Sequence, residues 1–354
     1  MNRCQPFLTH LAQRGYGAAL ISQRKNIFWL TGYRGEGLLL VTGDAQVILT
    51  DSRFEEQARQ EAPECRCVRT SQGAGAYAAA QSLCDEYRID TLCVETNALT
   101  YDQYRALEAS LQKVSLVSLG DLLTELRRVK DAYEIRCMEK AAEISCRAFE
   151  NILNRIHAGM TEKQIQHMLD YEMLLLGSEG NAFPTIVAAG LNGALPHAIP
   201  SDYALQKGDL ITLDFGGTYG GYCSDMTRTI GIGQVSEPLR AMYEAVLDAQ
   251  LRALQEVRPG ALCSEIDRCA REPLDERYPG AFGHGLGHGV GLNIHELPRL
   301  HPGGDTVLQA GHVITVEPGV YLPGFGGCRI EDMVIMTSDG YINPITITKQ
   351  LLEL

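Results

Sequence analysis

An internal repeat in the C-terminal part constrains the fold more than any other feature of the chain. Residues 205–216 read LQKGDLITLDFG and residues 308–319 read LQAGHVITVEPG, so an offset of 103 aligns Leu, Gln, Gly, Ile, Thr and Gly as identities. The predicted helices after Gly159 and after Gly260 are related by nearly the same offset, 101. Two copies of a helix-then-hairpin unit predict a domain built from two similar halves about a pseudo-twofold axis.

The first half contains a predicted hairpin over residues 213–229, LDFGGTYGGYCSDMTRT. Its glycine cluster can supply the positive φ angles that a tight turn needs. A turn centred between Tyr219 and Gly220 would place Asp214 opposite Asp225 on paired strands. Directly opposed residues have Cβ atoms roughly 4.5–5.5 Å apart. Two carboxylates held that close repel each other unless a cation lies between them.

The second half repeats this arrangement. Glu317 takes the place of Asp214, and a turn at residues 323–325 (Pro-Gly-Phe) would set Glu317 opposite Glu331. A single pair of acidic residues on one hairpin more often decorates a solvated surface than it binds a ligand. Two such hairpins facing each other would bring four carboxylates together, and that concentration of charge predicts bound cations.

A glycine-rich segment between the hairpins adds three histidines. Residues 283–296 read GHGLGHGVGLNIHE and contain His284, His288 and His295. Two divalent ions would balance the four carboxylates, with a neutral histidine completing the ligand set. A carboxylate-rich set favours Mn²⁺ or Co²⁺ over a structural zinc, which prefers Cys and His. Two ions about 3.5–4 Å apart activate water and polarise a carbonyl group, which is hydrolytic chemistry.

The N-terminal part predicts a separate domain, because a chain of 354 residues exceeds what one core usually serves. Predicted strands alternate there with helices, which indicates an α/β architecture, and the strands cover residues 18–21, 35–42, 45–50 and 91–94. Further along, Asp131 and Glu134 have the layout of a capping box at the start of a long helix. We therefore predict one domain over residues 1–122 and a second over residues 123–354.

Composition narrows the class of function. The net charge of −13 disfavours a nucleic-acid partner, which requires a basic surface. No apolar run approaches the ~20 residues of a spanning helix and the N-terminus lacks the layout of a signal peptide, so we expect a cytoplasmic protein without a membrane partner. The 11 cysteines lack the spacing of a disulfide framework and are expected to be reduced. The histidines outside the motifs are expected to be structural: His10, His157, His167, His301 and His312.

Four motifs carry a family resemblance. LDFGGTYGGYCSDMTRT, GHGLGHGVGLNIHE, VEPGVY and RIED resemble, in order and spacing, the metallopeptidases of family M24 with the pita-bread fold. Within that family they are similar to the Xaa-Pro group, which comprises aminopeptidase P and prolidase. Residues 24–58 resemble the creatinase-like N-terminal domain that this group carries. The resemblance implies an α/β (α+β) protein, with a creatinase-like domain followed by a catalytic pita-bread domain.

The resemblance also implies roles for individual residues. The five implied metal ligands are Asp214, Asp225, His288, Glu317 and Glu331. Of these, Asp225 and Glu331 would bridge two ions, and Glu317 would also carry a proton from water to the leaving nitrogen. The implied catalytic residues are His197, His284, His295, Glu317 and Arg329. The implied cofactors are two divalent ions, Mn²⁺ with Co²⁺ or Zn²⁺ as alternatives.

The implied reaction is hydrolysis of the peptide bond before proline, in short peptides with proline in second position. The sequence leaves open whether the substrates are Xaa-Pro dipeptides or longer peptides, although the compact N-terminal domain favours an aminopeptidase. A homodimer is the state implied by the family. Two alternatives remain: an aminopeptidase of broader specificity that also removes Met, and a non-catalytic or creatinase-like pita-bread protein. The second is disfavoured because none of the five ligands is missing.

Overall fold

The computed structural model describes residues 3–71 and 74–354. The chain divides into two compact units, Met1–Leu126 and Arg127–Leu354. Compactness does not test whether either unit folds by itself, so the domain boundary placed after residue 122 stays a prediction. In the part of the chain that the structure describes, no helix is both long and apolar enough to cross a membrane.

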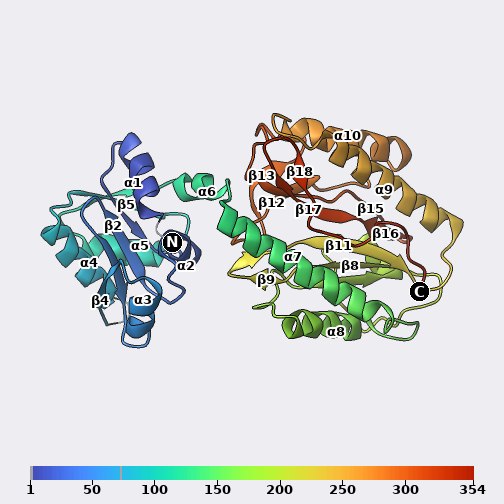
Figure 1. The fold of residues 1–354 in the computed structure, drawn as a ribbon, viewed down its shortest axis with the longest axis horizontal. Coiled ribbons are helices and arrows are strands. Elements are labelled where there is room, and N and C mark those ends of the chain that lie inside the picture. Colours follow the sequence, from blue (N-terminus) through green and yellow to red (C-terminus); the bar gives the residue numbers. More distant parts are fainter. Residues whose placement is uncertain (1–2, 72–73) are drawn as a thin grey trace. The chain divides into compact units, whose positions relative to one another are not determined.

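The first unit is built on a mixed sheet that includes β2, β4 and β5 (Figure 1). It has six strands in the order β4-β3-β2-β1-β5-β6. Its strands are β1 (Ala18–Ile21), β2 (Leu38–Thr42), β3 (Gln46–Thr50), β4 (Arg66–Arg69), β5 (Thr91–Val94) and β6 (Ser115–Ser118). The strands predicted at residues 35–42 and 45–50 are present as the antiparallel pair β2–β3, while β4, β5 and β6 join the sheet in parallel pairs. Strands β4 and β6 escaped prediction because both are short and neither contains a fully buried residue.

Helices alternate with these strands, as expected for an α/β unit. They are α1 (Cys4–Gln13), α2 (Arg24–Thr31), α3 (Glu55–Glu61), α4 (Ala74–Glu86), α5 (Tyr101–Ser110) and α6 (Leu122–Arg127). Helix α1 is amphipathic and buries Phe7 and Leu11 completely. On the central strands Leu20 and Leu40 are buried among apolar side chains of α4 and α5, which forms the core of this unit.

The second unit contains a sheet whose order mirrors the repeat. The order β13-β12-β14-β17-β11-β8-β7 places the second half of the repeat on one side and the first half on the other, and every pairing in this order is antiparallel. The strands are β7 (Ile186–Ala189), β8 (Leu210–Phe215), β11 (Met226–Gly231), β12 (Gly287–Gly289), β13 (Glu296–Leu300), β14 (Val313–Val316) and β17 (Glu331–Met336), with β18 (Tyr341–Ile342) paired to β17. The two halves therefore meet at the central pair β11–β17, as a pseudo-twofold arrangement requires.

Two helices from each half flank this sheet (Figure 1). They are α7 (Ala132–Leu153) and α8 (Glu162–Leu175) in the first half, and α9 (Glu237–Glu256) and α10 (Cys263–Arg277) in the second. The capping box predicted for Asp131 and Glu134 is present at the start of α7, and a second one, of Thr161 and Gln164, starts α8. These caps satisfy backbone N–H groups that have no partner within the helix.

The first hairpin has a different register from the predicted one. Asp214 pairs with Thr227 rather than with Asp225, and the turn between β9 (Thr218–Tyr219) and β10 (Tyr222–Cys223) lies at Gly220 and Gly221. Both glycines have positive φ, which is the conformation of a two-residue hairpin turn. The predicted centre was one residue too early, and this error shifts the pairing by two residues. A two-residue shift keeps side chains on the same face, so Asp214 and Asp225 still point to one side.

The second hairpin has the predicted register. Its strands β15 (Gly319–Leu322) and β16 (Gly326–Arg329) pair Gly319 with Arg329, and the outer strands pair Val316 with Asp332. Glu317 and Glu331 lie between these two pairs, one on each strand, as expected from a turn centred on Gly324. Both hairpins thus deliver their carboxylates to the middle of the sheet.

A buried ion pair fixes the central strands where they carry Glu331. The guanidinium of Arg228 on β11 contacts Asp332 on β17 through Nη2 at 2.8 Å, and its Nη1 donates to the carbonyl oxygen of Glu331 at 2.6 Å. Lys349 adds a second cation 2.8 Å from the other oxygen of Asp332. Because each charge here is paired, the group can stay buried without a large desolvation penalty.

Candidate metal centre

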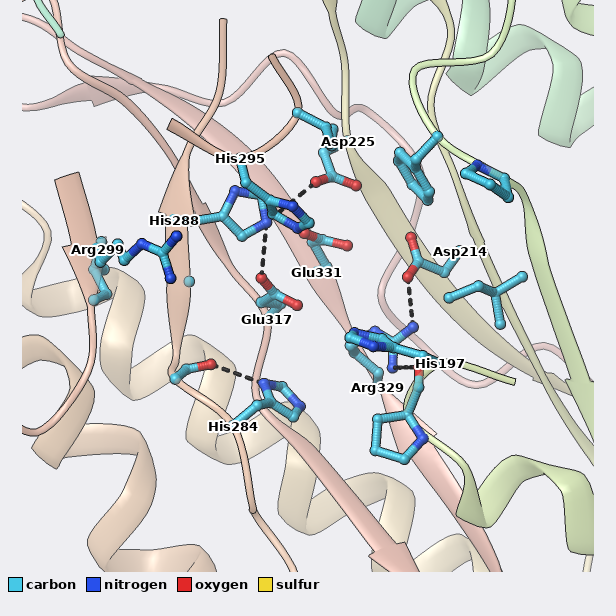
Figure 2. A pocket seen from close by; sticks show the side chains of 18 of the residues that line it. His197, Asp214, Asp225, His284, His288, His295, Arg299, Glu317, Arg329 and Glu331 are labelled. Carbon is cyan, nitrogen blue, oxygen red and sulfur yellow. Dashed lines mark hydrogen bonds and ion pairs between the residues drawn. The ribbon is translucent and has the colours of Figure 1, made fainter. Parts of the chain in front are cut away.

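All nine residues predicted for the site line one cavity of about 700 Å³ in the second unit. Figure 2 shows Asp225, Glu317 and Glu331 grouped around His288, with Asp214 beside Arg329. The strands and their ends supply these side chains: β8, β12, β16 and β17, together with the segments that follow β10 and β14. His197, His284 and His295 come from loops.

Three of the predicted ligands already form a compact set. One ligand atom each from Asp225, His288 and Glu331 lies within 4.8 Å of the others. The Nε2 atom of His288 is 3.6 Å from Asp225 Oδ2 and 3.3 Å from Glu317 Oε1. Its Nδ1 lies 3.0 Å from the carbonyl oxygen of Gly289 and donates to it, so the Nε2 lone pair faces the carboxylates. A histidine held in this way is oriented as metal-binding histidines are.

The carboxylates disturb one another because they are buried together. Burial raises the pKa of Asp225 well above its usual value, and the negative charges of Glu331 and Asp214 raise it further. The pKa of Glu331 is raised in the same way, by burial and then by Glu317 and Asp214. Burial also raises the pKa of Glu317 to about 7, against the opposing effect of Arg329. Charges that repel each other inside a protein call for a compensating cation.

Buried carboxylate oxygens without hydrogen-bond partners show whether these residues could hold a metal ion. Asp214 Oδ1 and Glu331 Oε1 are buried and have no hydrogen-bond partner among the described residues. Their second oxygens are engaged, Asp214 Oδ2 by Arg329 at 2.5 Å and Glu331 Oε2 by Thr227 at 2.6 Å. Each carboxylate is therefore held by one oxygen and leaves the other open. Buried acceptors rarely lack partners, and an ion bound by hard oxygen ligands would satisfy both.

A hydrogen-bond network joins Arg329 to other residues in and around the cavity. Its Nη1 donates to Tyr321 Oη at 2.7 Å and to the carbonyl oxygen of Pro196 at 3.1 Å. Tyr321 Oη also lies 3.0 Å from His284 Nε2, and His284 Nδ1 lies 2.8 Å from the carbonyl oxygen of Gly285. Both ring nitrogens of His284 are thus engaged by the protein. Burial lowers the pKa of His284 to about 4, so the ring is neutral.

The other two histidines leave their ring nitrogens available. His197 and His295 make no hydrogen bond to any residue within the described ranges. The ring of His295 packs edge-on against His288, with 4.4 Å between the ring centroids. Burial lowers the pKa of His295, and the nearby His288 and Arg299 lower it further. Both histidines can therefore offer an N–H donor or an acceptor to a ligand in the cavity.

Sequence reasoning missed several residues around the cavity. Arg299 and His301 line it, although His301 was expected to be structural. Alternation along β13, which follows His295, would have pointed to both of them. Tyr321 and Thr227 were also missed, and no sequence signal identifies them, because their roles depend on contacts between strands that are distant in sequence.

The glycines beside His288 have a steric reason. A Cβ on Gly287 would lie 2.0 Å from the carbonyl oxygen of Thr315, and one on Gly289 would lie 2.2 Å from that of Leu297. Strand β12 can therefore fit between β13 and β14 only if glycines flank the histidine. The glycine-rich sequence is what brings His288 this close to the carboxylates.

Comparison with known proteins agrees with this geometry. Residues 3–129 match the creatinase/prolidase N-terminal domain, and residues 136–338 match metallopeptidase family M24. The chain belongs to metallopeptidase family M24. The family and the two-part fold predicted from the motifs are thereby confirmed. Membership of this family implies binding of divalent metal ions, for which Asp225, His288 and Glu331 are the compact candidate set.

Similar proteins carry two different activities in their names. An Xaa-Pro dipeptidase from Pyrococcus furiosus is 35% identical over 341 residues, which cover 96% of each chain. The solved structure of an Xaa-Pro dipeptidase from Bacillus anthracis has a TM-score of 0.96 at 35% identity and covers 99% of both chains. That of an X-Pro aminopeptidase from Thermotoga maritima has a TM-score of 0.92, also at 35% identity, and covers 100% of both. Identity at this level does not separate the two specificities.

Proposed function

We propose that this M24 metallopeptidase hydrolyses the peptide bond before proline, in Xaa-Pro dipeptides in preference to longer peptides. The observation that carries the proposal is the cavity in which four carboxylates and His288 converge beside His197, His295 and Arg329. The names of the similar dipeptidases from Pyrococcus furiosus and Bacillus anthracis support the proline requirement.

The proposed ligands are Asp214, Asp225, His288, Glu317 and Glu331. Bound divalent ions would supply a Lewis acid for the scissile carbonyl group and lower the pKa of water toward neutrality. Glu317 Oε1 accepts a hydrogen bond from Thr315 at 3.0 Å, which leaves Oε2 to take a proton from water and pass it to the leaving nitrogen. Arg329 keeps Asp214 oriented by their contact at 2.5 Å.

The histidines divide into two roles in this proposal. His197 and His295 have available ring nitrogens and would hydrogen-bond the substrate. For His284 the proposal is a positioning role, because Tyr321 and the Gly285 carbonyl group engage both of its nitrogens. We assign His284 the task of orienting Tyr321, which in turn fixes Arg329.

Arg299 favours dipeptides over longer substrates. Its guanidinium lines the cavity and has no hydrogen-bond or ion-pair partner in the described part of the chain. A dipeptide ends in a free carboxylate directly after proline, whereas a longer peptide continues with an amide. Guanidinium and carboxylate groups form short, bidentate hydrogen bonds, so an unpaired arginine at this place selects the shorter substrate.

A substrate panel tests the proposed reaction. We expect the metal-loaded protein to hydrolyse Ala-Pro and Leu-Pro faster than Ala-Pro-Gly, and to leave Ala-Ala and Met-Ala nearly untouched. A chelator should remove the activity and Mn²⁺ should restore it. Faster cleavage of Met-Ala than of Ala-Pro would establish the broader aminopeptidase instead. Activity that survives removal of the metal would contradict a metal-dependent mechanism.

Arg299→Ala is expected to raise KM for Leu-Pro by about 10–100-fold, the equivalent of one hydrogen bond between charged groups. Its effect on Ala-Pro-Gly should be small, because that substrate presents no carboxylate at the same point. Steady-state kinetics on both substrates measure this difference, with Arg299→Lys as the variant that keeps the charge. An equal loss on both substrates would remove Arg299 from carboxylate recognition.

Two ions per chain are proposed from the number of ligands rather than from charge. The four carboxylates carry −4 and Arg329 carries +1, so one divalent ion leaves a net −1 and two leave +1. Charge balance does not choose between these counts. Only three of the five ligand side chains, Asp225, His288 and Glu331, form the compact set, so Asp214 and Glu317 are left to hold a second ion. We expect equilibrium dialysis followed by elemental analysis to give two Mn²⁺ per chain, and a plateau at one would contradict the dinuclear site.

Mn²⁺ as the working metal, with Co²⁺ or Zn²⁺ as alternatives, stays a prediction from the oxygen-rich ligand set. The homodimer and the cytoplasmic location likewise stay predictions.

A further inference from the structure

Glu162, the first residue of α8, is a buried carboxylate outside the cavity whose side chain is not accounted for by the proposed chemistry. It is 0% exposed, and the hydrogen-bond donors around it are backbone N–H groups, an amide and a hydroxyl rather than cations. Burying a carboxylate without a cation is costly unless several donors replace water. The arrangement of those donors therefore indicates what the charge is for.

All of the donors belong to one segment, residues 189–201. Glu162 Oε1 accepts from the Ala189 N–H at 2.7 Å, and Oε2 accepts from the Ser201 N–H at 2.9 Å and from Ser201 Oγ at 2.6 Å. The Asn192 side chain donates to both oxygens at 3.1 Å. A single carboxylate thus ties together the two ends and the middle of the segment.

That segment carries part of the cavity wall. Pro196, His197 and Ile199 line the cavity, and the carbonyl oxygen of Pro196 accepts the hydrogen bond from Arg329. The large apolar side chains of the segment contribute little to its packing, because Leu195 and Ile199 are 56% and 87% exposed.

Other contacts hold separate parts of the segment. Ala189 pairs with Ile211 on β8, Gly193 packs closely against Gly327, and the Ser201 carbonyl oxygen accepts from the Lys163 N–H at 3.2 Å. The Asn192 side chain also donates to Ser201 Oγ at 3.2 Å. None of these contacts joins the start of the segment to its end.

We propose that Glu162 is a positioning residue that closes residues 189–201 into a fixed loop and so sets His197 at the substrate. The inference rests on the proposed function for the part played by His197. A carboxylate suits this task because it only accepts hydrogen bonds, and all of the surrounding groups can donate. Glutamine has the same size but would turn an amide NH₂ toward one of these N–H groups.

The anchor is tested first without reference to activity, on metal-loaded full-length protein. We expect Glu162→Gln to speed hydrogen exchange of the Ala189 and Ser201 amides by about tenfold or more, as loss of a local anchor does. Ser201→Ala should have a smaller effect in the same segment. Thr161→Ala is the matched control, because it removes the cap of the same helix without touching the loop, and should lower Tm with exchange in residues 189–201 unchanged. Wild-type exchange in Glu162→Gln would overturn the proposal.

A double-mutant cycle then tests the coupling to His197. We expect Glu162→Gln to lower kcat/KM for Leu-Pro by ~10–100-fold, since small misplacements near a reacting group have effects of this size. Glu162→Gln should bind as much metal as the wild type despite its lower kcat/KM. The control Thr161→Ala should retain wild-type kinetics. In a His197→Ala background the added Glu162→Gln change should have almost no effect, because residues that act as a unit are not additive. The same loss in both backgrounds would overturn the positioning role.

The two proposals fail in different ways. A wild-type protein that does not cleave Xaa-Pro peptides would overturn the proposed function, and the exchange experiment would still decide whether Glu162 anchors the loop. Faster exchange in Glu162→Gln would then support the anchor, and unchanged exchange would overturn it.

Discussion

Asp225→Asn is expected to lower the hydrolysis of Xaa-Pro substrates by a factor on the order of 10⁴ and to reduce bound metal. The substitution keeps the size of the side chain and removes one of the charges that attract a divalent ion. Asp225 lies 3.6 Å from His288 and belongs to the compact set with Glu331, so its loss opens the centre of the ligand group rather than its edge. Metal ions contribute several kcal/mol of transition-state stabilisation, and ~5.5 kcal/mol corresponds to that factor.

Asp209→Asn provides the matched control for this change. Asp209 lies in the same unit and accepts hydrogen bonds from Tyr203 at 3.0 Å and from the Gln206 N–H at 2.8 Å, but it does not line the cavity. Kinetics with Leu-Pro and elemental analysis of dialysed protein measure the two effects. If Asp225→Asn kept both its metal and its rate while Asp209→Asn behaved in the same way, Asp225 would not be a ligand.

The repeat made the architecture of the second unit predictable. Identical residues at an offset of 103 identified two hairpins, and the observed sheet is symmetric about β11 and β17. The pairing register of each hairpin depended on the position of its turn. The Pro-Gly-Phe turn has a single centre at Gly324, and there the prediction was right. The first hairpin offers several glycines, and only the backbone conformation distinguishes Gly220 and Gly221 as the turn residues.

Site residues that belong to recognisable sequence motifs were predictable. Residues that contribute only through contacts between distant parts of the chain were not. The nine residues taken from the family resemblance all line the cavity, including His197, which lies outside the four motifs. Tyr321 and Thr227 became visible only in the structure, since a tyrosine or threonine in a strand has no distinctive pattern. Glu162 is the clearest case: in the sequence it is an ordinary acidic residue in the first turn of a helix, and its function follows from a loop 27 to 39 residues away.

The metal-free protein is expected to be stabilised by Glu331→Gln, and more so as the pH rises. Burial and the charges of Glu317 and Asp214 raise the folded-state pKa of Glu331 above the ~4.3 of an unfolded chain. A group with a raised folded-state pKa contributes stability that is present below the unfolded pKa and is lost as the pH rises through the folded one. Glutamine has no proton to lose, so the variant escapes this loss.

The variant must be compared with the wild type at each pH, because neighbouring histidines change the stability in the opposite direction as the pH rises. Burial lowers the pKa of His284 and of His288, and both therefore favour the folded state increasingly as the pH rises toward neutrality. Their contribution is common to both proteins and cancels in the difference of Tm. Each unit of raised pKa corresponds to ~1.4 kcal/mol, or about 3–6 °C in a domain of this size.

Thermal melts of both proteins in chelator, from about pH 5 to pH 8, measure the difference of Tm. We expect this difference to grow across that range, because the folded-state pKa of Glu331 is raised well above its usual value. Saturating Mn²⁺ should reverse the order, because a ligand that binds only the folded state stabilises the wild type. A difference in Tm that stays constant with pH would mean that Glu331 is not under charge repulsion in the folded protein, and the central argument for a cation at this site would fail with it.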